Sequence, residues 1–185
     1  MPSLSEAERR DALGLAHAAV IAAVAHQNLP KRIPQEGVFA EPRGVFVTLH
    51  VGEKLQGCIG AVQAKEPLGE AIVHCAISAA LEDPRFRPLQ LDQLAELRVE
   101  ISLLSSVEPI SPESVEIGRH GLLISHQGRR GLLLPQVAVE HHFSREQFLA
   151  ETCWKAGLPT DAWRNRDAKL FGFTCEVFSE PHHAL

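Results

Sequence analysis

The stretch from residue 44 to residue 62 reads GVFVTLHVGEKLQGCIGAV and predicts a β-hairpin. Residues 44–51 are rich in β-branched and aromatic side chains, residues 52–53 supply a turn, and residues 55–62 return as a second strand. Turns of two and of three residues put Cys58 on opposite faces of the hairpin. The sequence therefore leaves the orientation of this cysteine open.

Cys58 follows Gly57 directly and precedes Gly60 by two residues. Glycine weakens a strand, and it marks a bulge or a place where something approaches the backbone closely. In one interpretation the glycines keep the thiol reachable and leave backbone N–H groups for a developing oxyanion. In the other interpretation the backbone bends here only for packing.

The composition is that of a globular protein of one domain, or of one domain with two lobes. The chain has 185 residues, of which 45% are hydrophobic and 22% are charged. There are 18 basic and 23 acidic residues, a net charge of -5, so no basic surplus supports binding to nucleic acid. The four cysteines are irregularly spaced, which argues against a disulfide framework and for a reducing compartment. The first residues show no signal pattern and no span long enough for a membrane, so we expect a cytoplasmic protein.

Two capping boxes predict helix starts. Ser5 with Glu8, and Ser144 with Gln147, have the required spacing, and an apolar pattern of helical period follows each pair. Gly157 is expected just after the second of these helices. The expected helices cover residues 3–27, 67–82 and 145–156, with a short helical turn at 91–96.

The remaining segments predict strands. Residues 97–104 alternate between apolar and polar side chains, as a half-buried strand does. A second hairpin is expected from residues 121–125, a turn at 126–129 and the segment GLLLPQVAV, in which Pro135 ends regular pairing. Residues 169–178 close the fold as a strand. Because hairpins imply antiparallel pairing, the sequence predicts an α+β fold of antiparallel sheets flanked by helices.

Six motifs occur in one order along the chain: LQGCIGAV, EDPRF, LRVEISLLS, GRHGLLI, GRRGLLLPQVAVE and FLAETCWKAGLP. Together they resemble the AMMECR1 (AMMECR-one) domain family, whose bacterial and archaeal members are called AmmeMemoRadiSam system protein A. The resemblance covers roughly residues 40–180. It implies one domain over 1–185 with two sub-lobes, a loose tail at 181–185, and a glycine-flanked cysteine near a cleft. It also implies a Memo-like protein and a radical SAM enzyme as partners. This chain has Gln56 where the family commonly has arginine.

Cys58, His120 and Glu100 are the predicted catalytic residues. A thiolate is a nucleophile, and it needs an adjacent base or donor because a free cysteine has a pKa of about 8.5. The resemblance matches His120 to a G-x-H-G-L segment of the family, which makes it the preferred base for Cys58. Glu100 would orient His120 or bind a substrate amine. The alternatives are a small buried cysteine, a solvent-exposed turn histidine and an exposed strand glutamate.

Four further residues are candidates for substrate binding. Gly57 and Gly60 would let a ligand approach, and Gln136 would orient a substrate or an oxyanion through its amide. Arg85 would clamp a carboxylate with two hydrogen bonds. The alternatives are a local backbone cap for Gln136 and a corner ion pair with Asp83 for Arg85.

The sequence lacks the motifs that are typical of metal sites and cofactor sites. It has no H-x-x-x-H, C-x-x-C, G-x-G-x-x-G or P-loop pattern, so we expect no metal site and no cofactor. Two functions remain. The first is an enzyme in which Cys58 attacks or carries an electrophilic group of an unknown small substrate. The second is a protein-binding or scaffold module of the same system, with no role on nucleic acid or membranes.

Overall fold

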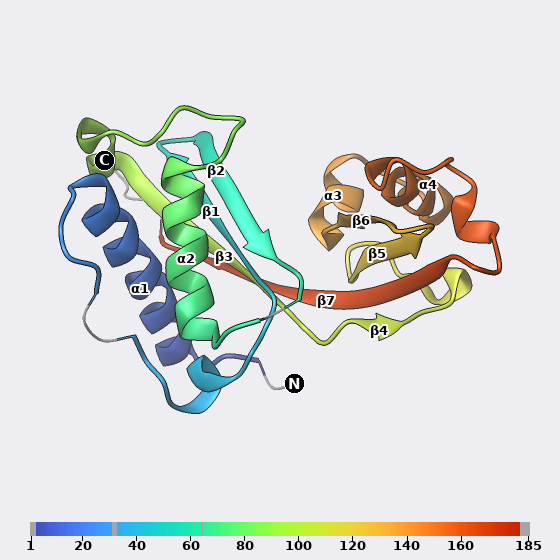
Figure 1. The fold of residues 1–185 in the computed structure, drawn as a ribbon, viewed down its shortest axis with the longest axis horizontal. Helices are drawn as coiled ribbons and strands as arrows, with labels where there is room; N and C mark the ends of the chain where they lie inside the picture. The colour runs from blue at the N-terminus through green and yellow to red at the C-terminus, as the bar shows by residue number, and fades with distance from the viewer. Residues whose placement is uncertain (1–2, 31–32, 64, 182–185) are drawn as a thin grey trace. The chain divides into compact units, whose positions relative to one another are not determined.

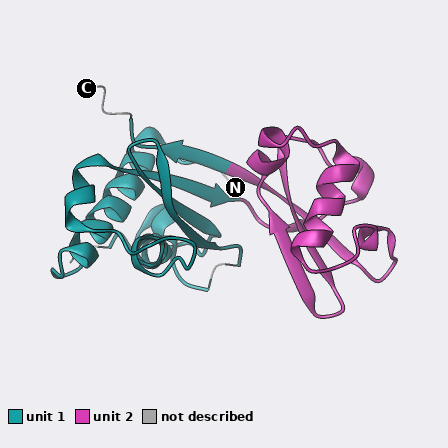
Figure 2. Cartoon of the chain, turned by 90° about the horizontal axis from the view of Figure 1, so that it is seen from above, with its two compact units in different colours: residues 1–104, 176–185 teal, residues 105–175 magenta. Residues whose placement is uncertain are grey.

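The computed structural model describes residues 3–30, 33–63 and 65–181 (Figure 1). Four of the five residues of the predicted tail, 182–185, lie outside the described residues. The chain forms two compact units, shown in two colours in Figure 2: unit 1 comprises residues 1–104 and 176–185, and unit 2 comprises residues 105–175. Helices and antiparallel strands occur in both units, which confirms the predicted α+β class. That the two units act as one domain stays a prediction.

Unit 1 is a sheet with two helices on one face (Figure 1). The sheet order is β2-β1-β3, followed by the end of β7, and β1 pairs antiparallel with both β2 and β3. Helices α1 and α2 pack on the strands through buried alanine, valine, leucine and isoleucine side chains. The elements are α1 (Glu6–Val24), η1 (Gly37–Ala40), β1 (Val45–Val51), β2 (Lys54–Ala61), α2 (Leu68–Leu81), η2 (Leu91–Glu96), β3 (Leu97–Leu104) and β7 (Lys169–Ser179).

Unit 2 is a small sheet packed against helices. Strand β5 pairs on one side with β6 and on the other with the first part of β7, which also pairs with β4. The tight turn between β5 and β6 has positive φ at Gln127 (49°) and Gly128 (76°), as a two-residue hairpin turn requires. The elements are β4 (Glu108–Pro109), η3 (Pro112–Ser114), β5 (His120–His126), β6 (Arg129–Leu133), α3 (Pro135–Glu140), α4 (Arg145–Lys155) and η4 (Ala162–Arg164).

Both predicted capping boxes are confirmed. Ser5 and Glu8 satisfy each other's backbone N–H groups at the start of α1, and Ser144 and Gln147 do the same for α4. Gly157 follows the C-cap of α4 with a positive φ of 69°, also as predicted. These signals involve only residues within one turn of each other, so the local sequence contains them.

Pairing of the second hairpin ends at Pro135, as predicted. The last pair involves Leu133, and the residues PQVAVE form the helix α3. Pro135 occupies the first turn of this helix, where its missing N–H costs nothing and its fixed φ suits the start of a helix. The sequence thus indicated where the strand ends but not the helix that follows it.

The first hairpin contains a β-bulge at Gln56. Leu49 pairs with Gly57, whereas the next residue of β1, His50, pairs with Leu55, so Gln56 has no residue opposite it. An extra residue of this kind bends its strand and shifts the register beyond it. The side-chain amide of Gln56 donates to the carbonyl oxygen of Arg87 at 2.7 Å.

The bulge decides which face of the sheet carries Cys58. A two-residue turn without a bulge would pair Cys58 with Val47, which is fully buried on the side of the helices. The extra residue shifts the register by one, and Cys58 pairs with Thr48 instead. Since a one-residue shift moves side chains to the opposite face, Cys58 lies on the face away from α1 and α2.

Packing accounts for the two glycines beside Cys58. A Cβ at Gly57 would overlap the carbonyl oxygen of Ala79 in α2, and a Cβ at Gly60 would overlap the ring of Phe46. Gly57 therefore allows α2 to lie directly on β2, and Gly60 gives room to its cross-strand partner. Of the two interpretations of these glycines, the one that invokes packing is sufficient, and their contact with a substrate stays a prediction.

We expect Gly57→Ala to destabilise the protein, because the added methyl group meets backbone that cannot move aside. The expected cost is about 1–3 kcal/mol, as for other over-packed positions. Gly14→Ala is the matched control, because Gly14 lies in α1 with nothing within 4 Å of its added Cβ. That change should stabilise by up to about 1 kcal/mol. Urea denaturation measures both, and equal stability of Gly57→Ala and the wild type would contradict the packing of α2 on β2.

Glu180 connects the end of β7 to β3 and to α1. Its backbone N–H donates to the carbonyl of Val99 at 3.0 Å, and its carboxylate accepts the N–H of Val99 at 2.9 Å. The same carboxylate lies 2.7 Å from Nδ1 of His17. This hydrogen bond raises the pKa of His17, against the opposing effect of burial.

A raised histidine pKa makes the contribution of His17 to stability depend on pH. The pair stabilises fully below the unfolded value, about 6.5, and this contribution is lost as the pH rises through the folded value. We expect the difference in unfolding free energy between wild type and His17→Gln to be larger at pH 5.5 than at pH 8.5. Urea titrations at the two pH values test this, and a difference independent of pH would contradict it.

Candidate functional site

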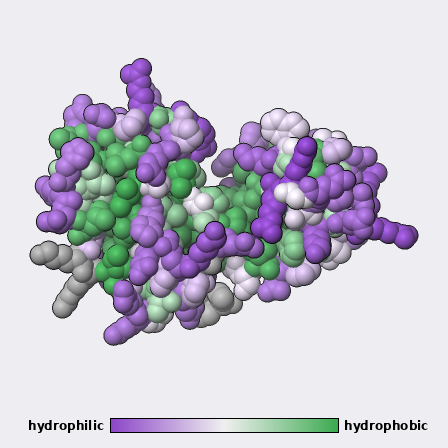
Figure 3. Space-filling view, viewed as in Figure 1, coloured by the Kyte–Doolittle hydropathy of each residue, from purple (hydrophilic) through white to green (hydrophobic). Residues whose placement is uncertain are grey.

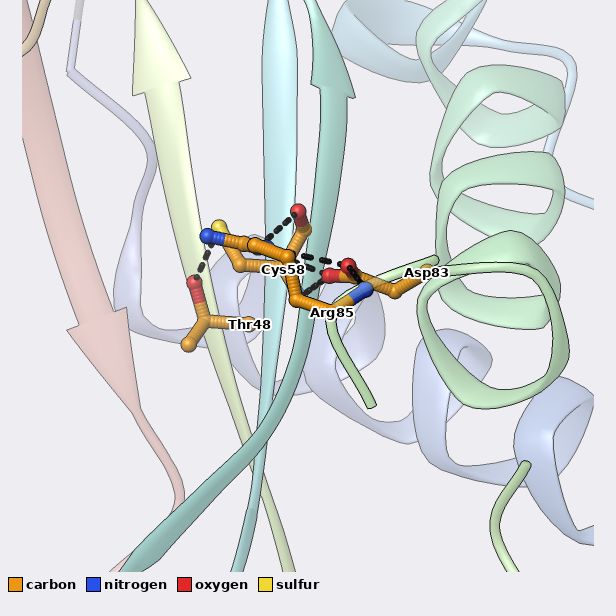
Figure 4. Close-up of polar contacts among 4 residues, drawn as sticks. All are labelled: Thr48, Cys58, Asp83 and Arg85. Carbon is orange, nitrogen blue, oxygen red and sulfur yellow. Dashed lines mark hydrogen bonds and ion pairs between the residues drawn. The ribbon is translucent and has the colours of Figure 1, made fainter. Parts of the chain in front are cut away.

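Asp83 lies just after α2 and points its carboxylate at Cys58 (Figure 4). The carboxylate is almost completely buried, with 2% of the side chain exposed. It accepts the backbone N–H of Cys58 at 2.9 Å and that of Arg85 at 3.1 Å. A buried carboxylate needs such donors, because an unpaired charge in the interior is costly.

Arg85 binds both the carboxylate of Asp83 and the backbone of Cys58. Its Nε and Nη2 donate to the two oxygens of Asp83 at 3.0 and 2.7 Å, and Nη2 also donates to the carbonyl of Cys58 at 3.0 Å (Figure 4). The corner ion pair weighed for Arg85 is therefore present. Asp83 and Arg85 together occupy the outward N–H and C=O of Cys58 on the edge strand β2. One interpretation of the sequence left backbone N–H groups available to an oxyanion. The N–H of Cys58 is not available, because it donates to Asp83.

The charges of this cluster support one another. The hydrogen bond from Arg85, with further bonds from backbone N–H groups, holds the pKa of Asp83 well below its usual range despite burial. The pKa of Arg85 is raised, first by its hydrogen bond to Asp83, and further by its charge interaction and hydrogen bond with the side chain of Cys58. The Arg85 guanidinium therefore lies next to Cys58, bound to its backbone carbonyl.

Three polar side chains form a row across the open face of the unit 1 sheet. Thr48 pairs with Cys58 on one side and with Glu100 on the other, so all three side chains share a face. The Thr48 hydroxyl donates to Sγ of Cys58 at 3.2 Å (Figure 4). The structure thus brings Cys58 and Glu100 to neighbouring strands, with a hydroxyl between them.

His120 belongs to unit 2 and is held locally. Its Nδ1 accepts the backbone N–H of Glu116 at 3.0 Å, so the neutral ring carries its proton on Nε2. With this bond in place, Nε2 is a donor and has no lone pair with which to take a proton. In this arrangement Nε2 of His120 donates a hydrogen bond. The role of His120 as a general base for Cys58, oriented by Glu100, stays a prediction.

Gln136 also belongs to unit 2, near the start of α3. Its Oε1 is buried and has no hydrogen-bond partner among the described residues, so this oxygen does not cap a neighbouring backbone group. Cys58, Glu100 and Arg85 lie in unit 1, whereas His120 and Gln136 lie in unit 2. A pairing of Cys58 with either of the two therefore stays a prediction.

Sequence reasoning missed Thr48 and the central position of Asp83. Thr48 faces Cys58 only because of the bulge at Gln56. Gly57 indicated a bulge or a close approach to the backbone, but it did not distinguish the two. Asp83 was considered as a partner of Arg85 alone. Its place next to Pro84, directly after a helix and two residues before an arginine, is the signal that points to a buried corner.

The four cysteines are free thiols with different surroundings. Burial raises the pKa of Cys75 to about 11, with smaller contributions from Glu66 and Cys58, and burial also raises the pKa of Cys153. Within residues 3–30, 33–63 and 65–181, no three His, Cys, Asp or Glu side chains converge as metal ligands. In the same ranges, no helix has the length and apolar character needed to cross a membrane.

We expect Asp83→Asn to destabilise the protein by about 1–3 kcal/mol at pH 7, because it replaces the charged acceptor of several hydrogen bonds at a nearly buried position. The lowered pKa of Asp83 means that its stabilising effect is present above the unfolded value of about 3.9 and is lost as the pH falls toward the folded value. The difference between wild type and variant should therefore shrink below pH 4. The control is Asp167→Asn, at an exposed position. Equal losses in the two variants would contradict the account.

The family model AMMECR1 matches residues 13–178. A protein of Thermococcus gammatolerans is 46% identical over 153 residues, covering 77% of this chain and 75% of its own. A protein of Pyrococcus furiosus is 44% identical, covering 83% and 77%. The crystal structure of an uncharacterized protein from Pyrococcus horikoshii superposes with a TM-score of 0.88 at 37% identity, covering 97% of this chain and 94% of that one.

Proposed function

The chain belongs to the AMMECR1 family, and we propose that it uses the Cys58 thiol as a nucleophile or carrier toward an electrophilic group of a small substrate. The observation that carries this proposal is the Arg85 guanidinium beside Cys58, fixed in place by the buried Asp83. A neighbouring cation favours thiolate, which is the reactive form. Arg85 thereby provides the positive charge that Gln56 does not.

The other residues of the open face would serve the same chemistry. The sulfur forms a bond to an electrophilic carbon, the leaving group departs with its electron pair, and the thiol proton passes to an acceptor on the protein. Glu100 is the acid–base group of the proposal in place of His120, because it shares the face of Cys58 and Thr48. His120 and Gln136 would contribute hydrogen bonds to the substrate. The setting is the pathway of a Memo-like protein and a radical SAM enzyme, in the cytoplasm and without a metal or cofactor on this chain.

A protein-binding module is the second candidate function, and apolar surface on unit 1 favours it. A cavity of about 490 Å³ lies between the ends of α1 and α2 and the segment 88–92, and its rim includes Leu91, which is 62% exposed. Apolar side chains also reach the surface over α1 and α2 (Figure 3), among them Ile21. A partner protein would cover this surface, and Cys58 would then be only a small residue of the sheet.

Alkylation of native protein separates the two candidates. We expect iodoacetamide to modify Cys58 faster than Cys75 and Cys153, because those two thiols are buried. Arg85→Gln should slow the reaction of Cys58 at pH 7, because it removes the cation next to this residue. Arg85→Lys should restore part of the rate. Mass spectrometry of each cysteine against pH gives these rates.

Arg87→Gln is the matched control, because it removes an exposed arginine two residues further along. Its Cys58 should react as in the wild type. If Cys58 reacts only after unfolding, or if Arg85→Gln and Arg87→Gln have the same effect, the nucleophile proposal fails. Capture of the Memo-like and radical SAM partners by Cys58→Ser protein then becomes the test of the second candidate.

A further inference from the structure

A second cavity lies wholly within unit 2, between β4, the start of β5 and the first part of β7. Its volume is about 190 Å³, below the range of about 300–1,000 Å³ typical of sites for drug-sized ligands. The space suits a small organic molecule rather than a segment of another chain. Its polar lining includes Ser106, Glu108, His120 and Thr174, and its apolar lining includes Ile110 and Phe173.

His120 offers this cavity a hydrogen-bond donor of fixed identity. The bond from the Glu116 N–H to Nδ1 places the ring proton on Nε2. His120 also pairs with Thr174 across β5 and β7, so the ladder of the sheet holds its backbone.

The remaining polar groups of the cavity differ in the hydrogen bonds that they already make within the protein. The Ser105 hydroxyl accepts the N–H of Thr174 at 2.9 Å and donates to the carbonyl of Ser106 at 3.0 Å. Within the part of the chain that the structure describes, the hydroxyls of Ser106 and Thr174 and the carboxylate of Glu108 have no protein partner. Glu108 is therefore the charged group of the lining, and its charge is negative.

We propose that this cavity binds a small molecule that carries an ammonium group next to a carbonyl or hydroxyl oxygen. The ammonium pairs with Glu108, and the oxygen accepts the Nε2 proton of His120. A short aliphatic group of the ligand packs on Ile110. The charge of Glu108, an exposed residue, disfavours an anionic ligand, because like charges repel. The site does not rest on Cys58, which lies in unit 1.

Nuclear magnetic resonance of the full-length protein tests the proposal with three probes of similar size. Alaninamide has both the ammonium and the carbonyl, propionamide lacks the ammonium, and isopropylamine lacks the carbonyl. We expect saturable shifts of the His120 and Thr174 amide signals with alaninamide, and binding at least tenfold weaker with the other two. A long-range proton–nitrogen spectrum should show the His120 proton on Nε2.

Variants assign the binding to Glu108. Glu108→Gln should abolish the shifts caused by alaninamide, whereas Glu113→Gln, an exposed acid of the same unit, should leave them unchanged. Cys58→Ser should also leave them unchanged, so failure of this site and failure of the proposed nucleophile are distinguishable. Absence of saturable shifts in the wild type, equal binding of the three probes, or unchanged binding in Glu108→Gln would overturn the proposal.

Discussion

The extra residue at Gln56 is the constraint on which the candidate site depends. It reverses the face of the sheet to which each later residue of β2 points. Gly57 therefore faces α2, and Cys58 lies on the open face beside Thr48. Because strands alternate their faces strictly, no smaller change could exchange these two positions. Without the bulge, Cys58 would pair with Val47 in the core and would meet neither solvent nor a polar neighbour.

The edge position of β2 explains why Asp83 and Arg85 are found where they are. An edge strand presents unpaired N–H and C=O groups, which attract other strands unless they are covered. At Cys58 the carboxylate and the guanidinium cover both groups at once. The same arrangement places a cation beside the thiol. The two residues that cover the sheet edge thus also create an electrostatic environment that Cys75 and Cys153 lack. At those two thiols, burial is the largest cause of the raised pKa.

Features set by neighbours in the sequence could be predicted, and those set by register could not. The capping boxes at Ser5 and Ser144, the alternation along β3 and the ion pair of Arg85 with Asp83 depend on residues a few positions apart. The face of Cys58 depends on a bulge, and it stayed open. Gly57 indicated either a bulge or a close approach to the backbone, and the local sequence does not show what packs against the strand.

The candidate site shows the same division between local features and features set by register. The sequence indicated Cys58 and, separately, the corner ion pair of Arg85 with Asp83, but it could not show that the two adjoin or that Thr48 faces the thiol. The Nδ1 bond of His120 to Glu116 arises from the turn before β5, which the spacing of residues does not reveal. Pro135 indicated the end of strand pairing, but the sequence did not show that the helix α3 begins there.

Disulfide trapping on β1 tests the bulged register most directly. Residues opposite each other in a pair without mutual backbone hydrogen bonds have Cα atoms about 4.5 Å apart, within the range that a disulfide spans. Oxidation of Thr48→Cys protein should therefore yield a bridge to Cys58, detected by mass spectrometry, and Val47→Cys protein should yield none. A bridge in the Val47→Cys protein and not in the Thr48→Cys protein would contradict the account, since Cys58 would then face the helices.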